Sequence, residues 1–431
     1  MLAAAPTFPY NRSAIATKSC TKAYWTSTPM RLLRNSKIVP VLMFHSVGLE
    51  SHSWIWNMLS ESVGSFEHKL TALKEHGFTT IFWRDLYDYM VGSRPLPRDS
   101  ILITFDDGYL DNWVLAYPIL KRLGMKATIF VTPEFVDPGS SVRPTLDDAE
   151  TGQCGREELQ IAGFLNWSEM RSMESSDFID IQSHALTHTW YFKSPHIVDF
   201  HAPDPRPRYP WLMWNARPDR KPFYLVEDQQ PFVPWGHPVF EHEKALLCTR
   251  FFPDDNRVAD IAGYVAGNGG AAFFETPGWR TTLSQLLVRL GLGEGFPGRY
   301  ETEGERETRV YTELLTSKRM LERNLAKAVD FVCWPGGGND AMVRRAALAA
   351  GYKSWTLGTR DPSAKRNLPN TDPTSIRRMN TSNEVWLWGR RVGTGGSRHQ
   401  LLRVYAHQMS LWHSALAYAS KAAMFAGRRG L

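Results

Sequence analysis

Closely spaced cysteines are absent from this chain. Its 431 residues include four cysteines, and no two of them form a Cys-x-x-Cys pair. The sequence therefore argues against a zinc site built from thiolates, and it gives no indication of a disulfide framework. The four cysteines are Cys20, Cys154, Cys248 and Cys333.

Long apolar runs and blocks of basic residues are also missing. No stretch reaches the roughly 20 apolar residues that a membrane-spanning helix needs. The net charge of +6 is spread along the chain, without the cluster of Lys and Arg that is typical of nucleic-acid binding. We therefore predict neither a membrane span nor a nucleic-acid partner.

The first 30 residues lack clear periodicity. They also lack the basic segment and the continuous apolar segment that together mark a signal peptide. We interpret residues 1–30 as a disordered leader or as an upstream mis-start. Without a signal peptide, the cytoplasm is the default prediction for location.

The sequence does contain an alternation of apolar strands and amphipathic helices. Residues 38–48 are typical of a buried strand, residues 62–77 of a helix, and "SILITF" and "KATIFVT" of two further strands with a helix between them. Such alternation predicts the α/β class with a largely parallel sheet. The pattern stops near residue 190 and resumes with an amphipathic helix at 311–327.

These breaks predict the organisation of the chain. We expect one large domain over residues 31–395, with an insertion at about 190–310, and a helical tail over residues 396–431. The insertion is rich in Pro, Trp, Arg and Phe, and we expect little regular structure at its start.

Two adjacent carboxylates stand at the end of a buried strand, in "ITFDDGY". Successive strand residues point to opposite faces, so Asp106 and Asp107 should diverge. Burying either one without a partner costs several kcal/mol, and a cation is the usual remedy. The alternative interpretation is a pair of residues that cap the following helix.

Two histidines follow another strand, in "SHALTH". His184 and His188 are four residues apart, a spacing that brings both imidazoles to one metal ion on a helix. On an irregular loop they would still follow a strand end, where parallel α/β folds build their sites. Alone, such a pair is more often structural. Beside the carboxylates it indicates a divalent metal site with one carboxylate and two imidazoles.

A glycine turn, "VCWPGGG", follows a later strand. Glycines let the backbone approach a ligand closely, and a turn that exposes N–H groups can hold an oxyanion. The alternative is an ordinary turn after a strand.

In this order, "PVLMFHSVG", "ITFDDGY", "SHALTH", "TSKRMLERNLAKAVDFVCWPGGG" and "AALAAGYKSWTLG" resemble the motifs of the polysaccharide deacetylases. These are metal-dependent carbohydrate esterases with the NodB-homology fold, a distorted (β/α) barrel. The resemblance covers about residues 38–190 and 311–380, so it leaves out the leader, the insertion and the tail.

The resemblance implies a role for each matching residue. Asp107, His184 and His188 would bind the metal, which would be zinc, with cobalt, nickel or iron as alternatives. Asp106 would be the general base that activates water, and a backbone N–H near Gly336 would hold the oxyanion. The implied reaction removes an N-acetyl group, or less commonly an O-acetyl group, from an acetylated carbohydrate.

Two departures from the family pattern concern the acid and the base. Cys333 stands where many members have an Arg that orients the base, which leaves the orienting group unidentified. The Leu-x-His motif that supplies the general acid has a literal match that ends at His413 inside the helical tail. His45, at the end of the first strand, is the better candidate for the acid, and a structural histidine is its alternative.

The insertion begins directly after His188 and should lie near the mouth of the site. Its tryptophans either line a sugar cleft or pack the interior of a cap. They are Trp190, Trp211, Trp214 and Trp235.

Two rival functions stay open from the sequence. One is a deformylase or amidase of the same fold that cleaves another C–N bond. The other is a catalytically degenerate barrel that binds carbohydrate, although a binding protein would have no need of Asp106. The sequence makes no prediction of the oligomeric state.

Overall fold

The computed structural model describes residues 35–51, 54–293, 295–357, 366–381, 384–387, 390–393 and 396–408. Within them, nine strands form one sheet in which every pairing is parallel. The strands are β1 (Val41–Phe44), β4 (Thr79–Ile81), β5 (Ser100–Phe105), β6 (Ala127–Val131), β7 (Ile179–Ser183), β12 (Phe331–Val332), β13 (Ser354–Thr356), β14 (Ser375–Ile376) and β15 (Met379–Asn380).

The sheet curls until its two ends meet. Its order is β14-β13-β12-β7-β6-β5-β1-β15, with β4 on β5 beside this path. The strands at the two ends, β14 and β15, are joined by Arg377 and Arg378 alone. One short segment therefore closes the sheet, and the prediction of a distorted (β/α) barrel is confirmed.

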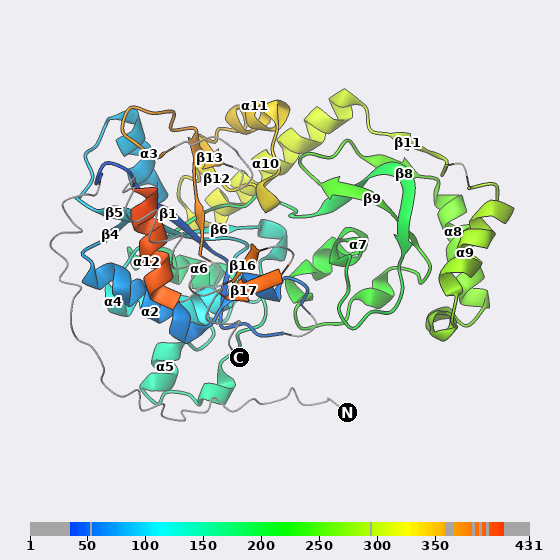
Figure 1. The fold of residues 1–431 in the computed structure, drawn as a ribbon, viewed down its shortest axis with the longest axis horizontal. Coiled ribbons are helices and arrows are strands. Elements are labelled where there is room, and N and C mark those ends of the chain that lie inside the picture. Colours follow the sequence, from blue (N-terminus) through cyan, green and yellow to red (C-terminus); the bar gives the residue numbers. More distant parts are fainter. Residues whose placement is uncertain are drawn as a thin grey trace.

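Helices cover the outside of the barrel (Figure 1). In α2, Ser62 caps the N-terminus by accepting a hydrogen bond from the Ser65 N–H, and Phe66, Leu70 and Leu73 are buried. Among the other helices around the barrel, α3, α6, α10 and α11 also bury apolar residues at helical spacing. The helices are α2 (Val63–Glu75), α3 (Trp83–Val91), α4 (Tyr117–Leu123), α5 (Leu146–Glu150), α6 (Trp167–Glu174), α10 (Glu303–Leu325), α11 (Ala341–Ala349) and α12 (Gly396–His407).

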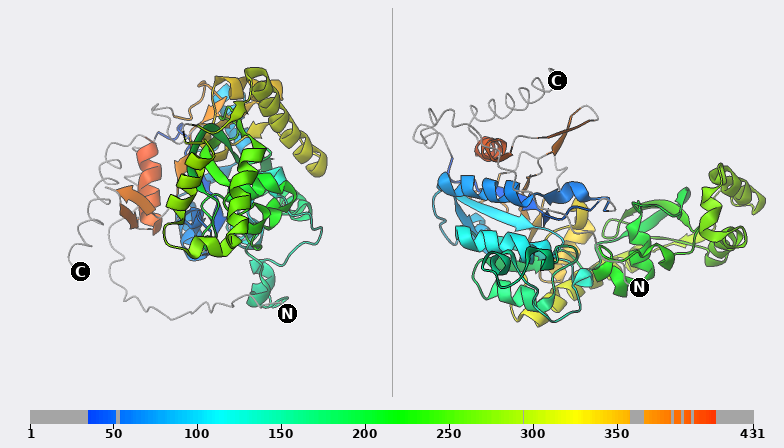
Figure 2. Two further views of the ribbon diagram at one scale, coloured as in Figure 1. Left: turned by 90° about the vertical axis from the view of Figure 1, so that its right-hand side faces the viewer. Right: turned by 90° about the horizontal axis from the view of Figure 1, so that it is seen from below.

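The insertion extends away from the barrel, and α10 returns the chain from it (Figures 1 and 2). It has two hydrophobic clusters of its own, one of which includes Trp54 and Tyr109 from the barrel side. Its main elements are β8 (Trp190–Phe200), α7 (Pro210–Ala216), β9 (Pro238–Lys244), β10 (Phe251–Pro253), α8 (Asp255–Gly267), α9 (Trp279–Arg289) and β11 (Gly298–Tyr300).

The expectation of little regular structure at the start of the insertion is wrong. The 11-residue strand β8 begins at Trp190 and pairs with β9 in antiparallel fashion. The pairing shifts register between Phe192 and Ile197, and this irregularity accommodates Pro195, which cannot donate to a ladder.

Two short sheets and the C-terminal helix complete the described part. β2 (Ser46–Val47) pairs with β3 (Ser60–Glu61), and β16 (Glu384–Leu387) pairs with β17 (Arg390–Gly393). Within the expected tail, Gly396–His407 form the helix α12. Residues 1–34 and 409–431, and with them the whole leader prediction and His413, lie outside the described residues. Among the helices described here, none is both long and apolar enough for a membrane crossing.

Candidate active site

Asp107 and two histidines converge at the C-terminal end of the barrel strands. The Asp107 Oδ1 atom lies 3.1 Å from His184 Nε2 and 3.2 Å from His188 Nε2. This oxygen is buried, yet no described residue meets it with hydrogen-bond geometry. A buried polar atom without a hydrogen bond is costly, and a cation held between these three side chains would remove that cost.

The backbone at both motifs is bent to bring the side chains together. Asp107 and Gly108 have φ values of 74° and 79°, so β5 ends in a tight turn that separates the two carboxylates. Ala185 and His188 also have positive φ. The two histidines are therefore placed by an irregular loop after β7 rather than by a helix.

The hydrogen bond of His184 prepares it for a metal. Its Nδ1 lies 2.9 Å from the Cys333 carbonyl oxygen, to which an N–H donates, and this leaves the Nε2 lone pair facing Asp107. The ligand atoms of Asp107, His184 and His188 all lie within 4.8 Å of one another. One carboxylate oxygen and two imidazole nitrogens fit a divalent metal with further coordination positions open.

The electrostatics of this cluster favour an ionised carboxylate. Burial raises the pKa of Asp107, but the imidazoles of His188 and His184 outweigh it, and the pKa lies well below its ordinary value. An anionic oxygen between two imidazoles is the state that a cation requires.

Asp106 points to a different partner, Arg378. The guanidinium is bidentate, with Nη1 2.6 Å from Oδ1 and Nη2 2.7 Å from Oδ2. Burial raises the pKa of Asp106, but the charge and hydrogen bonds of Arg378 more than compensate, so the pKa lies below its ordinary value. Arg378 thus occupies the orienting position for which the sequence offered no candidate.

Cys333 lies against both members of this ion pair. Its sulfur lies 3.1 Å from Arg378 Nη2 and 3.5 Å from Asp106 Oδ2. Asp106, His184 and Cys333 also form a compact group of possible ligands. Burial raises the pKa of the Cys333 thiol well above its ordinary value, and Asp106 is already paired, so this second group is a poor metal site.

His45 lies beside the same carboxylate, as its position at a strand end predicts. Its Nε2 is 3.8 Å from Asp106 Oδ2, and 16% of its side chain is exposed. Burial lowers the pKa of His45, and the Asp106 and Asp107 carboxylates oppose that effect. The imidazole is therefore placed near the base, and its role as general acid stays a prediction.

The glycine turn at Gly336 is packed against the insertion. Gly336 has a φ of 55°, and a Cβ there would come within 2.8 Å of the Lys244 side chain from β9. A Cβ at Gly338 would meet the same side chain at 2.9 Å. The positive φ favours glycine at Gly336, whereas the flexible lysine side chain could move aside. The oxyanion role of Gly336 stays a prediction.

The insertion also holds the loop that carries His188. Lys221 is almost fully buried, and its ammonium group pairs with Glu134 and donates to the Thr187 carbonyl oxygen at 2.8 Å. Thr187 directly precedes the metal-ligand candidate His188. The insertion therefore helps to fix the position of the second imidazole.

We expect Lys221→Met to weaken metal binding by about 10- to 100-fold, because groups that orient ligands contribute on that scale. The measurement is zinc affinity by competition with a chromophoric chelator, together with thermal unfolding to confirm a folded sample. Lys193→Met, at an exposed lysine of β8, is the matched control. Equal zinc affinity in the folded Lys221 and Lys193 variants would contradict this role of Lys221.

Comparison with known proteins agrees with this geometry. Residues 93–200, which include the Asp106–Asp107 pair and both histidines, match the family model described as polysaccharide deacetylase. The family region thus ends at Phe200, within the first strand of the insertion.

Two curated relatives match parts of this chain. YxkH of Bacillus subtilis, provisionally named a polysaccharide deacetylase, is 37% identical over 93 residues, which are 22% of this chain and 31% of YxkH. The poly-beta-1,6-N-acetyl-D-glucosamine N-deacetylase of Escherichia coli K12 is 25% identical over 132 residues, 31% of this chain and 18% of that protein. The matches thus span about a third or less of the relatives' length.

Among solved structures, a de-N-acetylase from Aggregatibacter actinomycetemcomitans has a TM-score of 0.49 and 16% identity. The superposition covers 81% of this chain and 97% of the other.

Proposed function

We propose that the protein is a metal-dependent hydrolase that removes N-acetyl groups from a carbohydrate. The observation that carries this proposal is that two adjacent carboxylates have different partners. Asp107 faces two imidazoles, and Asp106 is held by an arginine next to them. A protein that only bound a metal or a sugar would have no use for the second, oriented carboxylate.

Asp107, His184 and His188 would hold the metal, for which we propose zinc, while cobalt, nickel and iron suit the same donors. When bound, such a metal supplies Lewis acidity to water and to the acyl carbonyl. Asp106 is ionised at neutral pH because of its lowered pKa, so it can accept a proton from the attacking water. His45, beside Asp106, is placed to return a proton to the departing amine, and the Gly336 N–H would stabilise the oxyanion.

The substrate class rests on the family. The region that carries the site matches polysaccharide deacetylases, and one relative is named for N-deacetylation of poly-beta-1,6-N-acetyl-D-glucosamine. An acetylated glycan is therefore the substrate we propose. A deformylase or amidase would use the same centre, and the identity of the released acid separates these reactions. The cytoplasmic location stays a prediction.

The test combines metal content with acetate release from β-1,6-linked N-acetylglucosamine oligomers. We expect about one zinc per chain and acetate release that stops after chelation and returns with added zinc. Zinc binding without acetate from any acetylated glucosamine oligomer would refute the proposed substrate class, and failure to bind any divalent metal would refute the proposed mechanism.

A further inference from the structure

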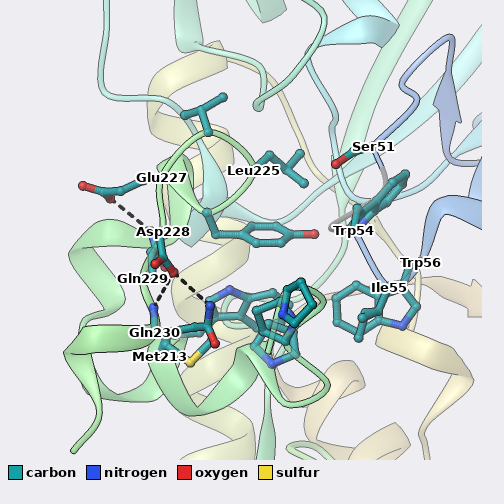
Figure 3. A pocket seen from close by; sticks show the side chains of 16 residues that line it. Ser51, Trp54, Ile55, Trp56, Met213, Leu225, Glu227, Asp228, Gln229 and Gln230 are labelled. Atoms are coloured by element: carbon teal, nitrogen blue, oxygen red, sulfur yellow. Dashed lines mark hydrogen bonds between the residues drawn. The ribbon is translucent and has the colours of Figure 1, made fainter. Parts of the chain in front are cut away.

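A hollow lies between the barrel and the insertion. It has a volume of about 390 Å³ and is lined on one side by Trp54 and Trp56, from the segment after β2, and on the other by the 224–230 loop of the insertion. Figure 3 shows Trp54 and Trp56 opposite Gln229 and Gln230 across this space. The family match covers residues 93–200, so both walls of the hollow lie outside the family region.

The lining combines flat apolar faces with polar groups. The rings belong to Trp54, Trp56, Trp214 and Tyr224. The carboxylate and amide groups belong to Asp228, Gln229 and Gln230. Sugar rings present the same combination, with C–H faces that pack on aromatic rings and hydroxyls that bond amides and carboxylates.

Buried polar atoms without partners surround this hollow. Trp214 is 2% exposed and Gln229 4% exposed, and among the described residues neither the indole Nε1 nor the Gln229 Oε1 has a hydrogen-bond partner. The Trp54 Nε1 is buried near the Tyr224 hydroxyl but without hydrogen-bond geometry. Native proteins leave few such atoms unpaired. Donors and an acceptor around one cavity indicate a ligand that has both.

The hollow is one aromatic ring away from the candidate metal centre. Trp214 packs edge-on against Phe135 at 5.0 Å, and Phe135 packs against His188 at 6.4 Å between ring centroids. By a second route, Trp56 stacks on Trp190 at 5.9 Å, and Trp190 lies 5.8 Å from His188. The residues that line the hollow therefore pack against rings that themselves contact His188.

The charge around the hollow favours a neutral ligand. Glu227 is neutralised by a bidentate pair with Arg220, which leaves Asp228 as the uncompensated charge of this loop. That carboxylate would repel an anionic sugar such as a uronate. A purely apolar ligand would leave the Trp214 and Gln229 atoms unpaired.

We propose that this hollow is a subsite for a neutral N-acetylhexosamine unit next to the unit that is deacetylated. The proposal rests on the proposed function and adds a preference for oligosaccharides over single sugars. Trp56 supplies the stacking face, and Trp214 and Gln229 supply a donor and an acceptor for the sugar's polar groups.

The test measures binding without turnover. The probe is a β-1,6-linked N-acetylglucosamine tetramer, titrated by calorimetry into zinc-loaded Asp106→Asn protein. We expect a second change, Trp56→Ala, to weaken tetramer binding by about tenfold or more, since a stacked ring contributes about one such factor. The matched control is Trp279→Ala, which truncates a tryptophan of α9 that does not line this hollow. Trp214→Phe, which keeps a ring and removes the N–H, is the second variant and should weaken binding several-fold.

Equal affinity of the Trp56, Trp214 and Trp279 variants, or no tetramer binding by the starting protein, would overturn the subsite. Thermal unfolding of each variant shows that a loss of binding is not a loss of fold. Acetate release by the wild type judges the proposed function separately. If the wild type releases acetate but Trp56→Ala leaves tetramer binding unchanged, only the subsite is refuted. If the tetramer binds in the hollow but no acetate is released, only the proposed reaction is refuted.

Discussion

Asp106→Asn should reduce acetate release by about 10²- to 10⁴-fold, the usual contribution of a general base, and leave the zinc content unchanged. The Asn side chain has the size of Asp and retains one oxygen for Arg378, but it cannot accept the proton of water. The zinc content should not fall, because Asp107, His184 and His188 do not depend on Asp106 for contact with one another. Single-turnover acetate assays and elemental analysis of the purified variant measure the two quantities.

Asp107→Asn is the counterpart for this experiment. It removes the charge that lies between the two imidazoles, so it should lose both zinc and activity. The protein would then keep its zinc without the Asp106 carboxylate and lose its zinc without the Asp107 carboxylate. An Asp106→Asn protein with wild-type acetate release would show that another group takes the proton.

Arg378→Met should lower both stability and turnover. Removing one member of a buried ion pair leaves the other uncompensated, which costs about 3–5 kcal/mol in the free energy of unfolding. Arg378 lowers the pKa of Asp106, so the pKa rises in its absence and the acid limb of the pH–activity profile should move to higher pH. Denaturant unfolding at pH 7 and a pH series of kcat test both parts.

The conservative variant Arg378→Lys separates charge from geometry. Lysine keeps the positive charge but not the planar fork that contacts both Asp106 oxygens. We expect it to recover most of the stability and part of the turnover. A merely structural role for Arg378 would predict a stability loss in the Met variant with an unchanged pH profile, and that result would contradict the assignment of Arg378 as the residue that positions the base.

The sign of the stability effect also depends on pH. Because the pKa of Asp106 is lower in the folded protein than its ordinary value, this pair contributes stability above the pKa of the unfolded chain and loses it as pH falls through the folded pKa. The difference in unfolding free energy between wild type and Arg378→Met should therefore be full at neutral pH and shrink only under strongly acidic conditions.

The sequence predicted the parts of the site that are local. Asp106 and Asp107 are adjacent, and His184 and His188 are four residues apart, so their motifs could be read directly. Parallel strands bring their carboxyl ends to one edge, which explains why motifs nearly 80 residues apart meet.

Arg378 escaped prediction because nothing near it in the sequence signals a buried charge. It stands in "SIRRMN", between two strands of two residues each, which show no hydrophobic period. Its partner is 272 residues away. The available clue was indirect: Cys333 replaces a family arginine and leaves an acid that needs a cation. In the insertion, strand β8 was not predicted because it contains Pro195, and a proline within an apolar run usually argues against a strand.

The segment that joins β14 to β15 comes late in the chain, and this affects when the sheet can be completed during synthesis. A ribosome delivers the metal-ligand candidates by residue 188 and the glycine turn by residue 338. The chain then still lacks β14, β15 and the arginine between them. The same few residues complete the sheet and orient the base, so a nascent or truncated chain that ends before them has an open barrel and an unpaired Asp106. In the mechanism that we propose, the base is therefore oriented only when these last strands of the sheet are in place.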